Sequence, residues 1–217
     1  MFAMTTSKSE ILGRIRAALG DEGRAATRME EYRAITRRYR QASELDAEAR
    51  LDLFLSRIQQ YDGGVFRCGP TAVRDTIARA LAARTTRRLV VPPGFPREWL
   101  PDGFEFAVDD GLSYQHLDRR DGVLTTCTVA IALTGTIVLQ HSPSEGRRAL
   151  TLVPDYHLCV VEAHQIVETV PEAMRRLRAL NPSLVTTISG PSATADIEMT
   201  RIKGVHGPRT LDVIVVG

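Results

Sequence analysis

The chain has 217 residues, of which 43% are hydrophobic and 25% are charged, and its formal net charge is +2. This is the composition of an ordinary globular protein, and it excludes a wholly disordered chain. No apolar run approaches the roughly 20 residues that cross a bilayer, and the first ten residues lack the apolar core of a secretory signal, so we expect a cytoplasmic protein that does not contact a membrane.

Basic residues are enriched near the N-terminus. Residues 1–40 contain nine Lys/Arg and five Asp/Glu, whereas the remainder contains nineteen and twenty-one. Because acidic residues are mixed with the basic ones and no recognised nucleic-acid-binding motif accompanies them, we do not expect the protein to bind nucleic acid.

Two amphipathic helices are predicted at the start of the chain. Residues 7–19 begin with Ser7 and Glu10 in capping-box spacing and carry apolar side chains on one side. Residues 29–42 also place apolar side chains on one face, with arginines around it. That face predicts either a helix that packs on its own domain or a docking arm for a partner subunit.

A third helix is predicted over residues 46–61, where an Asp-Gly-Gly turn signal follows. After this turn the pattern changes from amphipathic helices to short apolar runs. We therefore expect two domains, an N-terminal helical arm over residues 1–62 and an α/β domain over residues 63–217.

From residue 65 onward, apolar runs rich in β-branched residues alternate with helical segments. This alternation predicts an α/β fold with three layers, a mostly parallel sheet flanked by helices. Strands are expected at residues 65–68, 88–91, 104–108, 129–133, 137–139, 150–153, 158–161, 184–188 and 211–216. Helices are expected at residues 71–83, 112–117 and 169–180, the last of which opens with a capping box and a proline in its first turn.

The three cysteines, Cys68, Cys127 and Cys159, are far apart in sequence and lie in apolar, strand-like runs, so we expect buried thiols. An iron–sulfur cluster normally takes four closely spaced thiolates, which this chain lacks. His141 and His157 lack metal-ligand spacing, and the G-x-G-x-x-G, G-K-[ST], H-E-x-x-H and G-x-S-x-G motifs are absent from the sequence. No iron–sulfur, flavin, nicotinamide or metal motif is therefore recognised, and the cofactor is unassigned.

Residues 189–198, SGPSATADIE, are typical of a strand, a tight loop and a helix that begins near Thr194. Gly190 permits close backbone approach, and Ser192 or Thr194 can cap the helix. Free backbone amides at such a helix start bind a carboxylate or phosphate, beyond the carboxyl end of a strand. We therefore predict an anion-binding site at Ser189, Gly190, Ser192 and Thr194, although simple helix capping explains the same residues.

Charged and titratable candidates follow this loop. Asp196 falls in the first helical turn, where the helix dipole stabilises it, and is a further ligand-binding candidate. Glu198 is a candidate general acid/base or nucleophile. In the glycine-punctuated loop at residues 203–209, His206 is a candidate catalytic group and Gly207 a ligand-binding candidate, although a turn histidine satisfied by its neighbours fits equally well.

A second glycine bend, Thr134-Gly135-Thr136, interrupts an apolar stretch. The runs on either side are either two strands or one strand broken at the glycine. Because backbone amides are freed at such a bend, Thr134, Gly135 and Thr136 are also ligand-binding candidates.

The motif at residues 189–208, SGPSATADIEMTRIKGVHGP, followed by an apolar last strand, resembles the C-terminal signature of the lactate utilization protein C family, which belongs to the LUD domain group. Residues 134–136, 146–148 and 152–157 resemble the family's central block. One departure is Leu133, because family members commonly carry an acidic residue just before the T-G-T loop. The resemblance implies a NagB/RpiA/CoA-transferase-like fold, in which glycine loops hold anionic ligands.

The resemblance also implies a function. The family is associated with oxidation of lactate to pyruvate beside partner proteins, of which the cysteine-rich members carry iron–sulfur centres, so this chain is expected to be the cluster-free component. A different class of function is a stand-alone enzyme or binding protein for a CoA ester, folate or phosphosugar. A third is a structural adaptor that holds the partners together, and the residues leave open whether this chain performs a chemical step.

Overall fold

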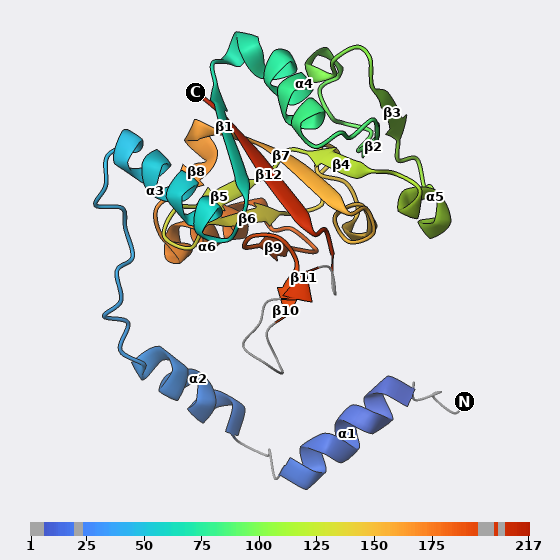
Figure 1. Cartoon of the computed structure of the whole chain (residues 1–217). Helices are drawn as coiled ribbons and strands as arrows, with labels where there is room; N and C mark the ends of the chain where they lie inside the picture. Colours follow the sequence, from blue (N-terminus) through green and yellow to red (C-terminus); the bar gives the residue numbers. More distant parts are fainter. Residues whose placement is uncertain (1–6, 20–23, 195–201, 204–206) are drawn as a thin grey trace. The chain divides into compact units, whose positions relative to one another are not determined.

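The computed structural model consists of two compact units, Met1–Tyr39 and Arg40–Gly217. The first contains helices α1 (Ser7–Leu19) and α2 (Arg24–Ala34), and the second contains all the other elements (Figure 1). The structure describes residues 7–19, 24–194, 202–203 and 207–217. Within these residues no helix is both long enough and apolar enough to cross a bilayer.

Helix α2 begins earlier and ends earlier than the helix predicted over residues 29–42, so that prediction was wrong in its bounds. A side chain just beyond the helix binds carbonyl groups at this end. The Arg37 guanidinium donates to the carbonyl oxygens of Tyr32 at 3.1 Å and Ile35 at 3.2 Å, and it lies over the Tyr32 ring, 4.7 Å from the centroid. A basic side chain near the C-terminus of a helix stabilises the last carbonyl groups in this way.

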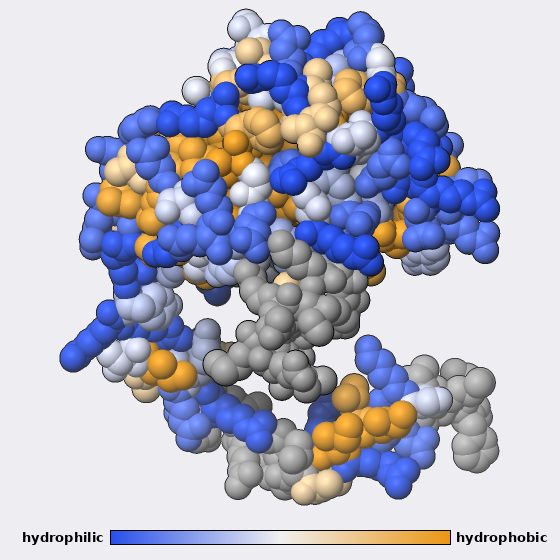
Figure 2. Space-filling model, in the orientation of Figure 1, coloured by the Kyte–Doolittle hydropathy of each residue, from blue (hydrophilic) through white to orange (hydrophobic). Residues whose placement is uncertain are grey.

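Apolar side chains remain exposed in the N-terminal unit. On α1, Ile11 and Ile15 are about half exposed, and Figure 2 shows apolar residues gathered along this helix. On α2 the same holds for Met29 and Tyr32. Both helices therefore present apolar surface, and the docking-arm interpretation stays a prediction.

A six-stranded, wholly parallel sheet forms the centre of the second unit, with strand order β1-β12-β7-β4-β2-β3 (Figure 1). Strands β7 and β12 are buried at nearly every position on both faces, as parallel strands commonly are. The strands are β1 (Gly64–Cys68), β2 (Arg88–Val91), β3 (Glu105–Val108), β4 (Gly122–Thr125), β7 (Tyr156–Glu162) and β12 (Thr210–Val216).

Four short strands form a second sheet that the sequence did not predict as separate, with order β8-β5-β6-β9. Strands β5 and β6 pair antiparallel, so the apolar runs beside the T-G-T bend are two strands and not one bent strand. The strands are β5 (Val129–Ile131), β6 (Thr136–Leu139), β8 (Ile166–Val167) and β9 (Thr186–Ile188).

Helices and the second sheet cover both faces of the large sheet, which confirms the predicted α/β class. Helix α4 (Val73–Ala83) packs on one face, and α3 (Ala47–Gln60) shares a core with the other face and the small sheet. Helix α6 (Val170–Leu180) covers the outer face of the small sheet. Shorter helices are α5 (Tyr114–Asp118) and the 3-10 helices η1 (Pro70–Ala72), η2 (Arg97–Trp99), η3 (Arg148–Thr151) and η4 (Ala163–Gln165).

Helix α6 has the ends that its sequence predicts. The Thr169 hydroxyl accepts from the backbone N–H of Glu172, and the Glu172 carboxylate accepts from the backbone N–H of Thr169, which forms the capping box. The helix ends at Asn181 in the left-handed conformation, with φ +47°. The amphipathic pattern and the residues at both ends therefore favour the same helix.

One strand prediction was wrong, another was wrong in its bounds, and four strands were missed, namely β4, β8, β10 (Ala193–Thr194) and β11 (Ile202–Lys203). The run at residues 150–153 overlaps the 3-10 helix η3, closed by the Leu150 N–H donating to the Arg147 carbonyl at 3.0 Å. The run at residues 184–188 begins as an exposed segment, and pairing starts at residue 186. Strand β4 was missed because only two of its four residues, Val123 and Leu124, are apolar, so it shows no apolar run of its own.

Helix α3 packs in the core of the second unit. The sequence grouped this helix with the N-terminal arm over residues 1–62, whereas its buried residues Leu51, Phe54 and Ile58 belong to the core of the second unit. The role of residues 1–62 as one arm stays a prediction.

The buried Glu168 carboxylate holds the start of the second unit. Its Oε2 accepts from the Ser43 hydroxyl at 2.7 Å and from the backbone N–H groups of Glu44 and Leu45 at 2.7 and 2.8 Å, and its Oε1 pairs with the Arg40 guanidinium. Burial acts to raise the pKa of Glu168, but these donors outweigh it and the pKa lies below its usual value. The folded protein therefore favours the ionised carboxylate.

Glu168→Gln removes this charge and keeps the side-chain size. Because the pKa is depressed on folding, the stabilisation is present above the unfolded pKa of about 4.3 and is lost as the pH falls through the folded value. We expect the variant to lose about 2 kcal/mol of unfolding free energy near neutral pH, and less in acid. Urea denaturation as a function of pH measures this, with exposed Glu98→Gln as the matched control. A wild-type pH dependence in Glu168→Gln would contradict the assignment.

Candidate functional site

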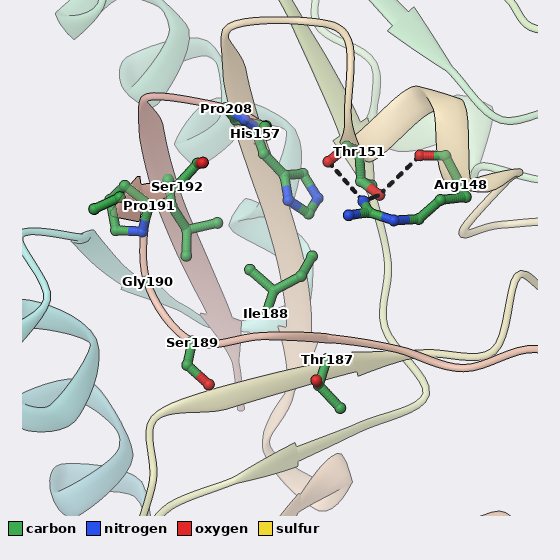
Figure 3. Close-up of a pocket in the computed structure, with 13 residues that line it drawn as sticks. Arg148, Thr151, His157, Thr187, Ile188, Ser189, Gly190, Pro191, Ser192 and Pro208 are labelled. Carbon is green, nitrogen blue, oxygen red and sulfur yellow. Dashed lines mark hydrogen bonds between the residues drawn. The ribbon is translucent and has the colours of Figure 1, made fainter. Parts of the chain in front are cut away.

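A pocket of about 220 Å³ lies between the large sheet and the segment that follows β9. Arg148 and Thr151 come from one side, residues 189–192 come from the other, and His157 lies between them (Figure 3). The described residues that line it are Arg148, Thr151, His157, Thr187, Ile188, Ser189, Gly190, Pro191, Ser192, Ala193, Gly207, Pro208 and Leu211.

The pocket lies at the amino ends of the parallel strands. His157 is the second residue of β7 and Leu211 the second residue of β12. Ligands of open α/β sheets usually collect at the carboxyl ends, and the predicted loop does follow the carboxyl end of a strand, namely β9. Because β9 belongs to the small sheet, the loop that follows β9 lies at the amino ends of the strands of the large sheet.

The predicted helix start at Thr194 is wrong. Ala193–Thr194 forms strand β10, which pairs antiparallel with β11, Ile202–Lys203. The backbone N–H of Ser192 donates to the Pro208 carbonyl at 2.8 Å, so this amide is not free for an anion. In the described part of this loop, which ends at Thr194, there is therefore no helix terminus that could bind an anion.

Several predicted site residues lie outside the described residues. They are Asp196, Glu198 and His206, and the side chain of Thr194 is likewise not described. Their predicted roles stay predictions.

The glycines of both predicted loops pack against the end of α3. Gly190 has φ +81°, and a Cβ there would overlap the Tyr61 side chain, lying 2.9 Å from its Cγ. Gly135 has φ +58°, and a Cβ there would lie 2.7 Å from the Arg57 Cβ. Both glycines are thus required by close approach of the protein to itself, in a conformation that other residues adopt with strain.

The two predicted ligand loops meet through their hydroxyl groups. The Thr134 and Thr136 Oγ1 atoms are 2.7 Å apart, and Thr136 Oγ1 is 2.8 Å from Ser189 Oγ. Ser189 lines the pocket, whereas Thr134, Gly135 and Thr136 do not. The T-G-T bend therefore supports the pocket wall from behind.

Four of the predicted ligand-binding residues line the pocket, namely Ser189, Gly190, Ser192 and Gly207. Arg148 and His157 were not predicted as site residues. In the sequence, Arg148 stands out only as part of a short block that resembles the family, and His157 has no partner at metal-ligand spacing. The residue that contacts the His157 ring, Thr125, lies on another strand, β4.

Arg148 is the one charged side chain among the described residues that line the pocket, apart from the titratable His157. Its Nη1 donates to the carbonyl oxygen and to the hydroxyl of Thr151, both at 3.0 Å (Figure 3). None of the ion pairs between described residues involves Arg148. Thr151 thus positions the guanidinium, and no carboxylate of a described residue neutralises it.

The preceding residue, Arg147, has a different partner. Its Nε and Nη2 donate to the Asp109 carboxylate at 2.7 and 3.0 Å, and it also contacts the Leu112 carbonyl. Burial acts to raise the pKa of Asp109, but the Arg147 guanidinium outweighs it and holds that pKa below its usual value. This bidentate pair fixes the entry to η3, on which Arg148 lies.

His157 is buried beneath the pocket, and its Nε2 lies 2.8 Å from the Thr125 hydroxyl. That hydroxyl also lies within hydrogen-bond range of the Cys159 thiol, at 3.8 Å.

Cys127 and Cys159 are buried, as predicted, whereas Cys68 is half-buried. The neighbouring Cys159 and burial both raise the pKa of the Cys127 thiol well above its usual value, which disfavours a thiolate there. In the described part of the chain, no three His, Cys, Asp or Glu side chains are grouped as metal ligands.

Comparison with known proteins places this α/β architecture in a family. The LUD domain family model matches residues 97–216. Lactate utilization protein C of Deinococcus radiodurans is 46% identical over 170 residues, which cover 77% of this chain and 79% of that protein. Lactate utilization protein C of Shouchella clausii is 34% identical over 113 residues, covering 50% of this chain and 49% of that protein.

A solved structure agrees with these relatives. The crystal structure of a DUF162 family protein from Deinococcus radiodurans superposes with a TM-score of 0.70 at 40% identity, covering 80% of this chain and 99% of that one. The chain therefore belongs to the LUD domain family. Within it, the chain groups with the proteins named lactate utilization protein C, as its motifs predicted.

Gly190 and Gly103 form a matched pair for testing the contact with α3. Their φ angles are +81° and +83°, but a Cβ at Gly103 meets nothing within 4 Å. Gly103→Ala therefore costs about 1 kcal/mol for the left-handed conformation alone. We expect Gly190→Ala to cost about 2 kcal/mol more, because its methyl group overlaps Tyr61. Chemical denaturation measures both, and equal losses would show that close approach to α3 is not why Gly190 is glycine.

Proposed function

We propose that this protein is a cytoplasmic component of a lactate-utilization system that oxidises lactate to pyruvate, in which it is the cluster-free subunit beside iron–sulfur partner proteins. The observation that carries the proposal is the 46% identity with a protein named lactate utilization protein C, over 77% of this chain. The buried positions of Cys127 and Cys159 are in keeping with it, since neither thiol is placed to hold a surface cluster. Electron transfer is then the work of the partners.

The pocket is the site that we assign to a small anionic ligand in this system. Arg148 supplies positive charge, and no carboxylate is present among the described residues that line the pocket. An anion therefore gains attraction without meeting a like charge. Hydroxyl groups of Ser189 and Ser192 offer further hydrogen bonds.

The alternative function is a stand-alone enzyme or binding protein for a CoA ester, folate or phosphosugar. Pockets for drug-sized ligands span about 300–1,000 Å³, whereas the volume here is about 220 Å³. The size favours a ligand smaller than a CoA ester or a folate. A purely structural adaptor would need no ligand at all.

Deletion of the gene tests the proposed role directly. We expect the deletion strain to lose growth on lactate and to keep growth on glucose, because the remaining subunits lack their cluster-free component. A tagged copy restores growth and retains iron–sulfur proteins during purification, detected by their visible absorption and iron content. Normal growth of the deletion strain on lactate would contradict the proposal.

Thermal denaturation with added ligands separates the alternatives, because a ligand that binds the folded state raises Tm with its concentration. We expect a shift with small anions and none with CoA esters or folates. A Tm that no compound changes would favour the adaptor. If a CoA ester does bind and turn over, Glu198→Gln is expected to abolish turnover, with the exposed Glu98→Gln as the control. Unchanged turnover in Glu198→Gln would remove Glu198 from the mechanism.

A further inference from the structure

We infer that Arg148 and His157 together recognise a small 2-hydroxy- or 2-oxo-monocarboxylate, with Arg148 at the carboxylate and His157 at the 2-oxygen. This inference rests on the proposed function and specifies the ligand of the same pocket. It concerns binding and orientation alone. Neither residue belonged to the site predicted from sequence.

Arg148 has the geometry of a carboxylate receptor. One nitrogen, Nη1, is used by both oxygens of Thr151, which holds the guanidinium plane in place. Nε and Nη2 make no hydrogen bond with the described residues, and these neighbouring donors match the two oxygens of a carboxylate. Arg148 directly follows Arg147 in the chain. Because the Asp109 carboxylate holds the Arg147 side chain, the backbone that carries Arg148 has little freedom to move.

His157 supplies a second, differently shaped contact. Its Nε2 is engaged by the Thr125 hydroxyl at 2.8 Å, and Nδ1 makes no hydrogen bond with the described residues. When the Thr125 hydroxyl donates to the Cys159 sulfur, it accepts from Nε2–H, and Nδ1 is then an acceptor. An acceptor at this place binds the hydroxyl of a 2-hydroxy acid. In the other neutral tautomer, Nε2 accepts from the Thr125 hydroxyl and Nδ1–H donates to a 2-oxo group.

The rest of the pocket fits a short apolar tail. Ile188, Pro191, Pro208 and Leu211 line it with carbon atoms. A methyl group on the 2-carbon gains burial against such a wall, worth about 0.8 kcal/mol for each methylene-sized unit. A guanidinium, a hydrogen-bonding ring and an apolar wall together favour a small organic acid over inorganic anions.

Isothermal titration of the full chain tests this assignment with lactate, pyruvate, propionate, inorganic phosphate and CoA. Propionate has the carboxylate and the tail but lacks the 2-oxygen. We expect lactate or pyruvate to bind at least about ten-fold more tightly than propionate, which corresponds to one hydrogen bond to a charged or polarised group. Equal binding of propionate, or tighter binding of phosphate or CoA, would overturn the inference.

Variants separate the two contacts. Arg148→Gln is expected to weaken lactate and propionate alike by at least about ten-fold, whereas Arg178→Gln, exposed on α6 and outside the pocket, leaves both unchanged. Thr125→Val removes the group that orients His157, so it should reduce the preference for lactate over propionate without changing propionate affinity. Thr125→Ser should restore the preference. Unchanged lactate affinity in Arg148→Gln would overturn the inference.

The outcomes distinguish this inference from the proposed function. Loss of growth on lactate after gene deletion, without binding of any 2-hydroxy or 2-oxo acid, sinks the ligand assignment and leaves the proposed function standing. Binding of lactate together with normal growth of the deletion strain would contradict the proposed function and leave the ligand assignment standing. Circular dichroism of the Thr125 variants shows whether they fold, and the Arg148→Gln variant carries the test if they do not, because Arg148 is exposed.

Discussion

The packing of α3 into the cleft between the two sheets is the constraint on which the rest of this fold depends. Phe54 and Ile58 fill the core that the sheets share, and the end of the same helix presses on two loops of the small sheet. Those loops pass so close to the helix that Gly135 and Gly190 have no room for a side chain. One helix thus sets both the spacing of the sheets and the path of the chain that forms the pocket wall.

The pocket follows from this arrangement of two sheets. A single parallel sheet directs its ligands to the carboxyl ends of its strands, but here β9 delivers its loop to the opposite end, beside His157 and Leu211. Residues from β7, β12, η3 and the loop after β9 then converge, although they are far apart in the chain. A sheet that is buried on both faces leaves its strand ends as the place where such groups meet solvent.

Local signals in the sequence were sufficient for much of the fold. The capping box of α6 and the apolar run of β12 fix those elements by themselves, and the family motifs indicated the right group. The second sheet was beyond such signals, because pairing of β5, β6, β8 and β9 is decided by contacts distant in sequence. The same limit applied at the site, where the sequence does not reveal that Gly190, which lines the pocket, also packs closely on Tyr61 at the end of α3. His157 is defined by a hydroxyl on a neighbouring strand, which spacing along the chain does not reveal.

The two adjacent arginines at the start of η3 have different partners, and this determines how the protein tolerates substitution there. Arg147 is committed to Asp109 through two hydrogen bonds, while Arg148 faces the pocket. Side chains one residue apart on a tight helical turn leave the axis in different directions, so neither can take the place of the other. The doubled arginine therefore provides no redundancy. A chain that lost one of them would keep one positive charge nearby but would lack either the ion pair with Asp109 or the charge that lines the pocket.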